Sequence, residues 1–161
     1  MNLFFIFILM TKFNITKLFK RELARKAHQR NTPKMADNYK FQNKFYQLIE
    51  FGNLPALQRF YHFNPDRIDI SAENEQAFSY ACEFGHLEIA EWLFLIKPDI
   101  NISAENEYAF RYASKNGHLT VAEWLLQIKP DINISADNDF AFRYASANKH
   151  SELANWLRQI K

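Results

Sequence analysis

The chain has 161 residues and a formal net charge of +2, and 48% of its residues are hydrophobic, 24% charged and 16% aromatic. This length supports a single domain with one sizeable core, and with only 3 Gly and 5 Pro the composition argues against disorder, collagen and turn-rich all-β folds. The single cysteine, Cys82, excludes an intramolecular disulfide and a Cys-rich zinc module.

The first 34 residues differ from the rest in charge. They hold eight Lys or Arg residues against Glu22 alone, a net charge of +7, which leaves residues 35–161 with a net charge of −5. A mildly acidic surface is a poor ligand for nucleic acid, so the repeats described below are not expected to bind any. The apolar run Leu3–Met10 would span only about 12 Å as a helix, against about 30 Å of membrane hydrocarbon. We therefore predict a separate leader, residues 1–34, that cannot cross a membrane alone.

Several interpretations of this leader remain open. One is a poorly ordered segment in front of a functional domain that begins near Met35. The others are a secretion signal, a mitochondrial-type presequence, and an anchor that makes weak contact with a membrane surface through the apolar run and its lysines.

From residue 70 onward the sequence repeats with a period of 32 residues. Residues 70–101 and 102–133 are identical at 23 of 32 positions, residues 134–161 form a third copy, and a fainter unit at about 38–69 matches at a spacing of 33. Repeats of this length are typical of solenoids, in which each unit covers the apolar face of its neighbour. We predict one repeat domain, residues 35–161, with about four stacked units.

Each unit is predicted to contain a helix, a turn, a second helix and a loop. In residues 102–133 a stripe of apolar residues at helical spacing lies between Ala109 and Ala113, and Gly117 ends this helix. Residues 118–129 are apolar almost all round, as in a helix that is covered on several sides. Pro130 stops the second helix, and residues 131–135 lead to the next unit as an extended or turn segment. The predicted fold class is all-α.

Residues 38–161 resemble the ankyrin repeat. The resemblance rests on residues 85–93 (GHLEIAEWL) and 117–126 (GHLTVAEWLL), on the Asp-Ile-Asn triplets at 99–101 and 131–133, and on Ala81, Ala113 and Ala145. The Thr-Pro-Leu-His signature of the family is missing, the unit is one residue shorter than the usual 33, and residues 104–107 contain no glycine. The resemblance implies an ankyrin-type helix-turn-helix solenoid whose finger loops need not form regular β-hairpins. The variant also resembles the divergent ankyrin arrays of very large DNA viruses.

Three columns of large side chains recur once per unit and are expected to be structural. Stacked helices lie about 8–10 Å apart, so histidines of adjacent units are not expected to share a metal ion. We expect the aromatic columns to pack in the core and the histidines to bond backbone near a helix start. No metal and no cofactor is expected. The columns are Phe78, Phe110 and Phe142; Trp92, Trp124 and Trp156; and His86, His118 and His150.

Acidic residues also recur, at the expected loop tips. At such tips we expect them to be solvated or to favour a helix N-terminus, rather than to act as paired catalytic carboxylates. A Gly-rich phosphate loop, a nucleophile elbow and an HExxH motif are all missing from the sequence, so we predict that the chain is not an enzyme. The recurring acids are Glu73, Glu75, Glu105, Glu107, Asp137 and Asp139.

Positions that differ between otherwise identical units are candidates for a binding surface. Large aromatic side chains beside guanidinium groups are enriched at interface hot spots, so we predict a partner-binding patch on the concave side formed by the fingers and first helices. The alternative is that the aromatic residues pack between units and that the arginines pair with Glu105, Glu107 or Asp139. The candidates are Gln76, Tyr108, Arg111, Lys115, Phe140 and Arg143.

The resemblance implies a non-catalytic protein–protein interaction module, an ankyrin-repeat adaptor that binds a partner protein of unknown identity. We expect a monomer in the cytoplasm, which is the host cytoplasm if the chain is viral. The alternative function is a membrane-associated or mitochondrial protein, in which the leader carries the address and the repeats form a docking scaffold.

Overall fold

A computed structural model describes residues 37–161, and the leader at residues 1–34 lies outside the described residues. Residues Phe41–Lys161 form one compact unit. The preceding unit is described only at residues 37–40, which are helical. The interpretations of the leader therefore stay predictions.

Every regular element among residues 37–161 is a helix. The absence of strands in this range confirms the all-α class and shows that the described finger loops form no β-hairpin. The helix of residues 37–50 is followed by α3 (Leu54–Phe63), the 3-10 helix η1 (Pro65–Arg67), α4 (Ala72–Glu83), α5 (Leu87–Ile96), α6 (Ala104–Lys115), α7 (Leu119–Ile128), α8 (Ala136–Ala147) and α9 (Ser151–Ile160).

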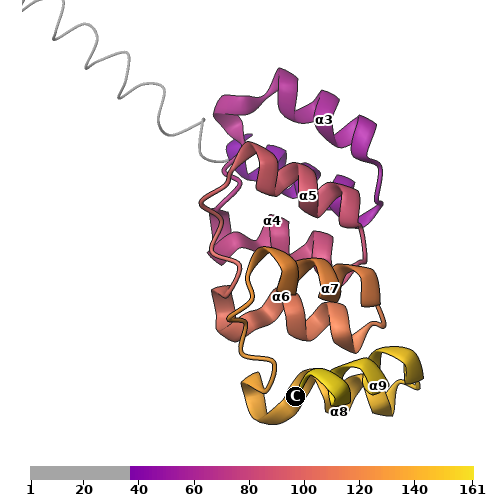
Figure 1. Cartoon of the computed structure of the whole chain (residues 1–161). Helices are drawn as coiled ribbons and strands as arrows, with labels where there is room; N and C mark the ends of the chain where they lie inside the picture. Colours follow the sequence, from indigo (N-terminus) through magenta and orange to yellow (C-terminus); the bar gives the residue numbers. More distant parts are fainter. Residues whose placement is uncertain (1–36) are drawn as a thin grey trace, which may run out of the picture. The chain divides into compact units, whose positions relative to one another are not determined.

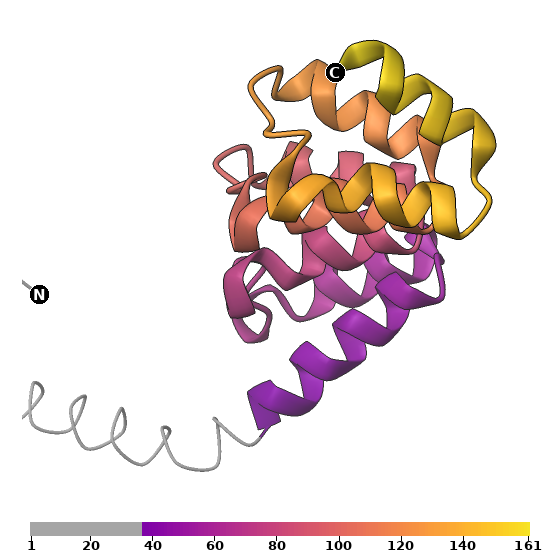
Figure 2. The same ribbon diagram turned by 90° about the horizontal axis from the view of Figure 1, so that it is seen from below.

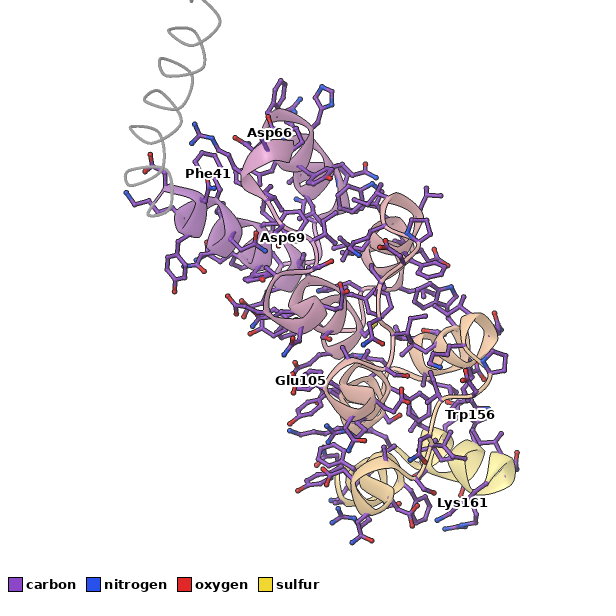
Figure 3. All side chains as sticks on the ribbon, turned by 90° about the vertical axis from the view of Figure 1, so that its left-hand side faces the viewer. Phe41, Asp66, Asp69, Glu105, Trp156 and Lys161 are labelled. Carbon is purple, nitrogen blue, oxygen red and sulfur yellow. The ribbon has the colours of Figure 1, made fainter. Side chains whose placement is uncertain are left out.

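The helices of residues 41–161 form two layers (Figure 1, Figure 3). The first helices α4, α6 and α8 pack on one another in chain order, and each contacts the second helix of its own repeat, α5, α7 or α9. Figure 2 looks along this stack, with α8 nearest to the viewer. Contacts thus run from each repeat to its neighbour, as in a solenoid.

Alanines let the first helices approach one another closely. Beside them, Phe78 and Phe110 fill the space toward the second helices and are each only 1% exposed. Full burial of one such side chain contributes about 1.5–3 kcal/mol. The alanines, each at most 1% exposed, are Ala77, Ala81, Ala109, Ala113, Ala141 and Ala145.

The tryptophans of the second helices are partly buried and pack on aromatic rings of the preceding repeat. Figure 3 shows Trp156 in the layer of second helices, away from Glu105. In the last repeat, the ring of Phe142 has the guanidinium of Arg158 at 5.5 Å instead. The centroid distances are 5.6 Å for Tyr61–Trp92, 6.0 Å for Phe78–Trp124 and 6.5 Å for Phe110–Trp156.

A histidine of each repeat lies against the glycine that follows the first helix of the preceding repeat. At Gly117, φ is +82°, a left-handed conformation that favours glycine, and a Cβ there would lie less than 3.0 Å from ring atoms of His150. The pairs Gly52–His86 and Gly85–His118 repeat this contact. The ring also bonds the preceding repeat, since Nε2 of His86 lies 3.0 Å from the carbonyl oxygen of Glu50.

Lys149 takes the place of the glycine in the last repeat. Its φ of 64° is as left-handed as that of the glycines. No histidine of a later repeat lies against it within residues 37–161. The contact with histidine, and not the turn itself, therefore sets the strict requirement for glycine.

We expect Gly117→Ala to lower the free energy of unfolding by about 2–4 kcal/mol. Alanine disfavours the left-handed backbone conformation, and its Cβ would displace the ring of His150. Urea unfolding measures this loss. Lys149→Ala is the matched control, because it changes a left-handed residue that no histidine covers, and its effect should stay below about 1 kcal/mol. Equal losses in the two variants would contradict the Gly–His contact.

The pH dependence of stability should depend on His118. Burial lowers the pKa of His118 from its ordinary value of 6.5, although a hydrogen bond with the backbone of Glu83 acts in the opposite direction. The unfolded chain therefore binds the proton more readily, and the free energy of unfolding should fall as the pH drops below about 6.5. Thermal unfolding between pH 7.5 and 5 measures this fall. His118→Gln, which cannot titrate, should show a shallower slope, and an unchanged slope would refute the assignment.

Candidate functional site

Each finger loop ends in a left-handed turn of three residues. We define the finger loops as residues 65–75, 97–107 and 129–139, and the finger face as the surface formed by these loops and α4, α6 and α8. The turns lie within the first four residues of α4, α6 and α8, so the right-handed part of each helix begins only after them. Left-handed backbone costs about 1–2 kcal/mol per residue except at glycine, and asparagine tolerates it best. With φ between 52° and 65°, the turns are Glu73-Asn74-Glu75, Glu105-Asn106-Glu107 and Asp137-Asn138-Asp139.

The third residue of the turn points inward and ties its finger to the next one. Glu107 is only 7% exposed, and its Oε1 accepts hydrogen bonds from Oγ of Ser103 at 2.8 Å and from the N–H of Asn133 at 3.4 Å. Glu75 is 8% exposed and accepts from the N–H of Asn101 at 3.4 Å. The expectation of solvated acids at the loop tips is therefore wrong for Glu75 and Glu107. The backbone of the next finger covers them.

In the first and last described units another residue stands at the position of this glutamate and makes a different contact. In the first unit Gln42 donates to the carbonyl oxygen of Asp69 at 2.9 Å and accepts from its N–H at 3.0 Å. In the last unit Asp139 accepts from Nζ of Lys161 at 2.7 Å, and this bond lowers the pKa of the Asp139 carboxyl group. Figure 3 shows Asp69 and Lys161 at these two places.

Arg111 clamps the turn of its own repeat. Its Nε donates to the carbonyl oxygen of Asn106 at 2.8 Å and its Nη2 to that of Glu105 at 3.1 Å. Its Nη1 pairs with Oδ2 of Asp137 in the next finger at 2.8 Å, and its Cζ lies 4.9 Å from the ring centre of Phe140. The side chain of Arg111 is only 11% exposed, and the hydrogen bonds described here are all made to groups of this domain.

Arg143 repeats the clamp in the last described repeat. Its Nε donates to the carbonyl oxygen of Asn138 at 2.7 Å and its Nη2 to that of Asp137 at 3.2 Å. Arg143 is exposed and forms no ion pair within residues 37–161. Part of its guanidinium is thus available to a ligand.

A ladder of four rings runs across α6 and α8 on the finger face. The ring centroids are 4.0 Å apart for Tyr108 and Tyr112, 5.3 Å for Tyr112 and Phe140, and 4.2 Å for Phe140 and Tyr144. The Nζ of Lys115 lies 4.8 Å from the ring centre of Tyr112 and 5.8 Å from that of Tyr144. These distances suit aromatic stacking and cation–π attraction. We call these five residues the aromatic patch.

The predicted binding residues are not equally accessible. Phe140 is 8% exposed and Arg111 is engaged in its clamp, which agrees with the alternative of internal packing, although the carboxylate partner of Arg111 is Asp137. Tyr108 is partly buried, and its hydroxyl donates to Oε2 of Glu83 at 2.8 Å. Gln76 lies one repeat earlier and donates to the hydroxyl of its own neighbour, Tyr80, at 2.6 Å.

Sequence reasoning missed Tyr112 and Tyr144. The position is tyrosine in all three units from residue 70 onward, so it is not among the positions that differ between these units. Their spacing of four residues from Tyr108 and Phe140, which places side chains on one face of a helix, was the available signal.

Groups that could carry chemistry are few in the described residues. Cys82 is fully buried, and burial raises the pKa of its thiol, which disfavours the reactive thiolate. Residues 37–161 hold no cluster of three or more His, Cys, Asp or Glu side chains that could bind a metal ion. Within the same range, every helix is too short or too polar to span a bilayer.

Comparisons with known proteins agree with this geometry. The family description "Ankyrin repeats (3 copies)" matches residues 45–136 and 78–161. An ankyrin repeat family protein from Legionella pneumophila, solved by X-ray crystallography, is 35% identical with a TM-score of 0.66, and the match covers 73% of this chain and 36% of that one. This chain thus spans about a third of the length of that protein. No curated protein matches the sequence. The matched structure is bacterial and gives no support to the resemblance to viral arrays.

The tie between fingers predicts opposite effects of two substitutions at Glu107. Glu107→Ala leaves the N–H of Asn133 without its acceptor and should lower the free energy of unfolding by about 1–2 kcal/mol. Glu107→Gln copies the residue at Gln42, which bonds both the N–H and the carbonyl of the next finger, and should raise the free energy of unfolding by about 0.5–1 kcal/mol. Urea unfolding at pH 7 measures both. A loss in Glu107→Gln as large as in Glu107→Ala would contradict this tie.

Proposed function

Because this chain belongs to the ankyrin-repeat family, we propose that it is a non-catalytic adaptor that binds a partner protein through the concave side of its repeats, the finger face. Ankyrin repeats generally mediate protein–protein interaction, and their fold is typically a non-enzymatic scaffold. The fold alone names no partner, since function resides in the side chains displayed on it. We propose a protein partner for a monomeric chain in the cytoplasm.

The observation that carries the proposal is the aromatic patch. Tyr144 is 37% exposed although it stacks on Phe140, and Lys115 lies above two rings at the same surface. Exposed aromatic rings beside cations are the groups that most often contribute binding energy at interfaces. The ladder holds these groups in place before a partner arrives, which reduces the entropy lost on binding.

The buried residues in and beside the aromatic patch support the accessible ones. Phe140 and Arg111 fix the rings and the fingers from within the domain. Lys115, Tyr144 and Arg143 then offer a ring and two cations to a partner. This division between supporting and contacting residues determines which substitutions can test binding without unfolding the protein.

The alternative of a targeted protein depends on residues 1–34, which lie outside the described residues. It stays a prediction from the sequence, as does weak membrane contact.

We expect the double variant Lys115→Ala, Tyr144→Ala of the full chain to lose the partner that the wild type captures from a lysate of its source cells. Loss of two hot-spot groups should weaken binding at least about tenfold. Quantitative pull-down with mass spectrometry measures the loss, and circular dichroism verifies that helical content is kept.

The matched control is Leu95→Ala, Gln127→Ala, which removes exposed groups from the second helices α5 and α7. This control should capture the partner as the wild type does. A partner retained by the Lys115, Tyr144 variant, or lost equally by the control, would show that the finger face at α6 and α8 is not the binding surface.

A further inference from the structure

The surroundings of Arg111 provide a template for guanidinium binding on the finger face. Two carbonyl oxygens of a left-handed turn, one carboxylate of the next finger and two aromatic rings surround its guanidinium. The rings are Tyr112, at 5.8 Å from Cζ, and Phe140, at 4.9 Å. Together these groups meet the hydrogen-bonding, charge and stacking preferences of a guanidinium.

The equivalent position in the preceding repeat holds a serine instead of an arginine. Ser79 stands 32 residues before Arg111, and a pocket of about 210 Å³ lies beside it. In that repeat no side chain of residues 37–161 donates to the carbonyl oxygens of Glu73 and Asn74. Figure 3 shows Glu105, one wall of this pocket, on the finger side of the first helices. The pocket is lined by Glu73, Asn74, Gln76, Ser79, Tyr80, Glu105 and Tyr108.

The lining repeats the template residue by residue. Glu73 and Asn74 correspond to Glu105 and Asn106, whose carbonyl oxygens accept hydrogen bonds from Arg111. Glu105 corresponds to Asp137, which supplies the carboxylate. Tyr80 and Tyr108 correspond to the rings at 112 and 140. A shift of 32 residues thus changes the central side chain from a guanidinium to a hydroxyl, the acid from Asp to Glu and one ring from Phe140 to Tyr108. It also places Gln76 in the lining, where the next repeat has Tyr108.

We propose that this pocket receives an arginine side chain of the partner protein, so that the partner supplies the guanidinium which Arg111 supplies in the next repeat. The inference rests on the proposed function and names one feature of the partner, an exposed arginine.

Charge and hydrogen bonding both favour this ligand. No Lys or Arg lines the pocket, whereas two carboxylates do. The amide of Asn74 donates to Oε1 of Glu105, and the other carboxylate oxygen stays available to a donor. Gln76 also lines the pocket, and its Oε1 is a buried acceptor that has no hydrogen-bond partner within residues 37–161. A planar group with five donors suits this set of acceptors better than an ammonium group.

The test titrates N-acetyl-L-arginine methylamide into the ¹⁵N-labelled full chain and follows backbone amide signals by NMR. We expect saturable shifts at residues 73–80 and 105–108, with a Kd on the order of 1 mM for so small a probe. The lysine analogue should bind at least about tenfold more weakly and the uncharged citrulline analogue should not saturate. Absence of saturable shifts with the arginine probe, or equal binding of the citrulline probe, would overturn the proposal.

Two variants locate the binding. Ser79→Arg places a guanidinium in the pocket, as in the next repeat, and should abolish the shifts while it raises the melting temperature by about 3 °C. Glu105→Gln should weaken binding about tenfold, and Glu123→Gln on α7 is its matched control and should bind as the wild type does. If Ser79→Arg failed to fold, the Glu105→Gln and Glu123→Gln pair would still decide. Unchanged binding in Glu105→Gln would overturn the proposal.

The titration needs no partner protein, so its result is independent of capture through Lys115 and Tyr144. Capture without arginine binding would refute this inference and leave the adaptor function intact. Arginine binding without capture would support the pocket and refute the proposed binding surface at α6 and α8.

Discussion

The contact between one repeat and the next is the constraint on which the rest of this structure depends. A single pair of helices exposes an apolar face that it cannot cover itself. In a solenoid without one central core, only the neighbouring repeat can bury this face. Alanines bring the first helices together, and each tryptophan of a second helix packs on a ring of the preceding repeat, as Trp124 does on Phe78. The fingers and their turns are placed by this stacking, so every group on the finger face depends on it.

The left-handed turns show how this support is used. Three consecutive left-handed residues would be unfavourable in a free loop. Here the buried carboxylate of Glu107 joins the turn to the finger that follows, and Arg111 satisfies two of its carbonyl oxygens. Because two independent contacts secure the turn, one of them can be lost. The repeat with Ser79 has the hydrogen bond from Asn101 to Glu75 but no arginine at position 79. A pocket therefore lies where the next repeat has the side chain of Arg111, and the finger is still held by Glu75.

The sequence was sufficient to predict the period, the helix pair and the stop at Pro130, because these depend on local spacing. It left the conformation of the finger loops open, since a missing glycine argues against a hairpin without specifying what replaces it. It did not predict the inward glutamates. An acid at a loop tip looks solvated until the next finger is seen to cover it. Glu75 shares the left-handed conformation of the exposed Glu73, but as the third residue of the turn it contacts the next finger. The aromatic patch was half predicted, since Tyr108 and Phe140 vary between repeats whereas their stacking partners do not. The partner of Arg111 could not be predicted without the left-handed turn that brings it to two carbonyls and Asp137.

The contact between glycine and histidine also determines how such an array can change its length during evolution. A duplicated copy of residues 102–133, inserted directly after residue 133, would bring a histidine that fits on Gly117 and a glycine that accepts the histidine of the following repeat. The same copy attached behind residue 161 would place its histidine against the side chain of Lys149. Tandem duplication within the array therefore preserves every junction, whereas a copy placed after residues 134–161 meets Lys149 in place of a glycine. The near identity of residues 70–101 and 102–133 is what growth by internal duplication would leave behind.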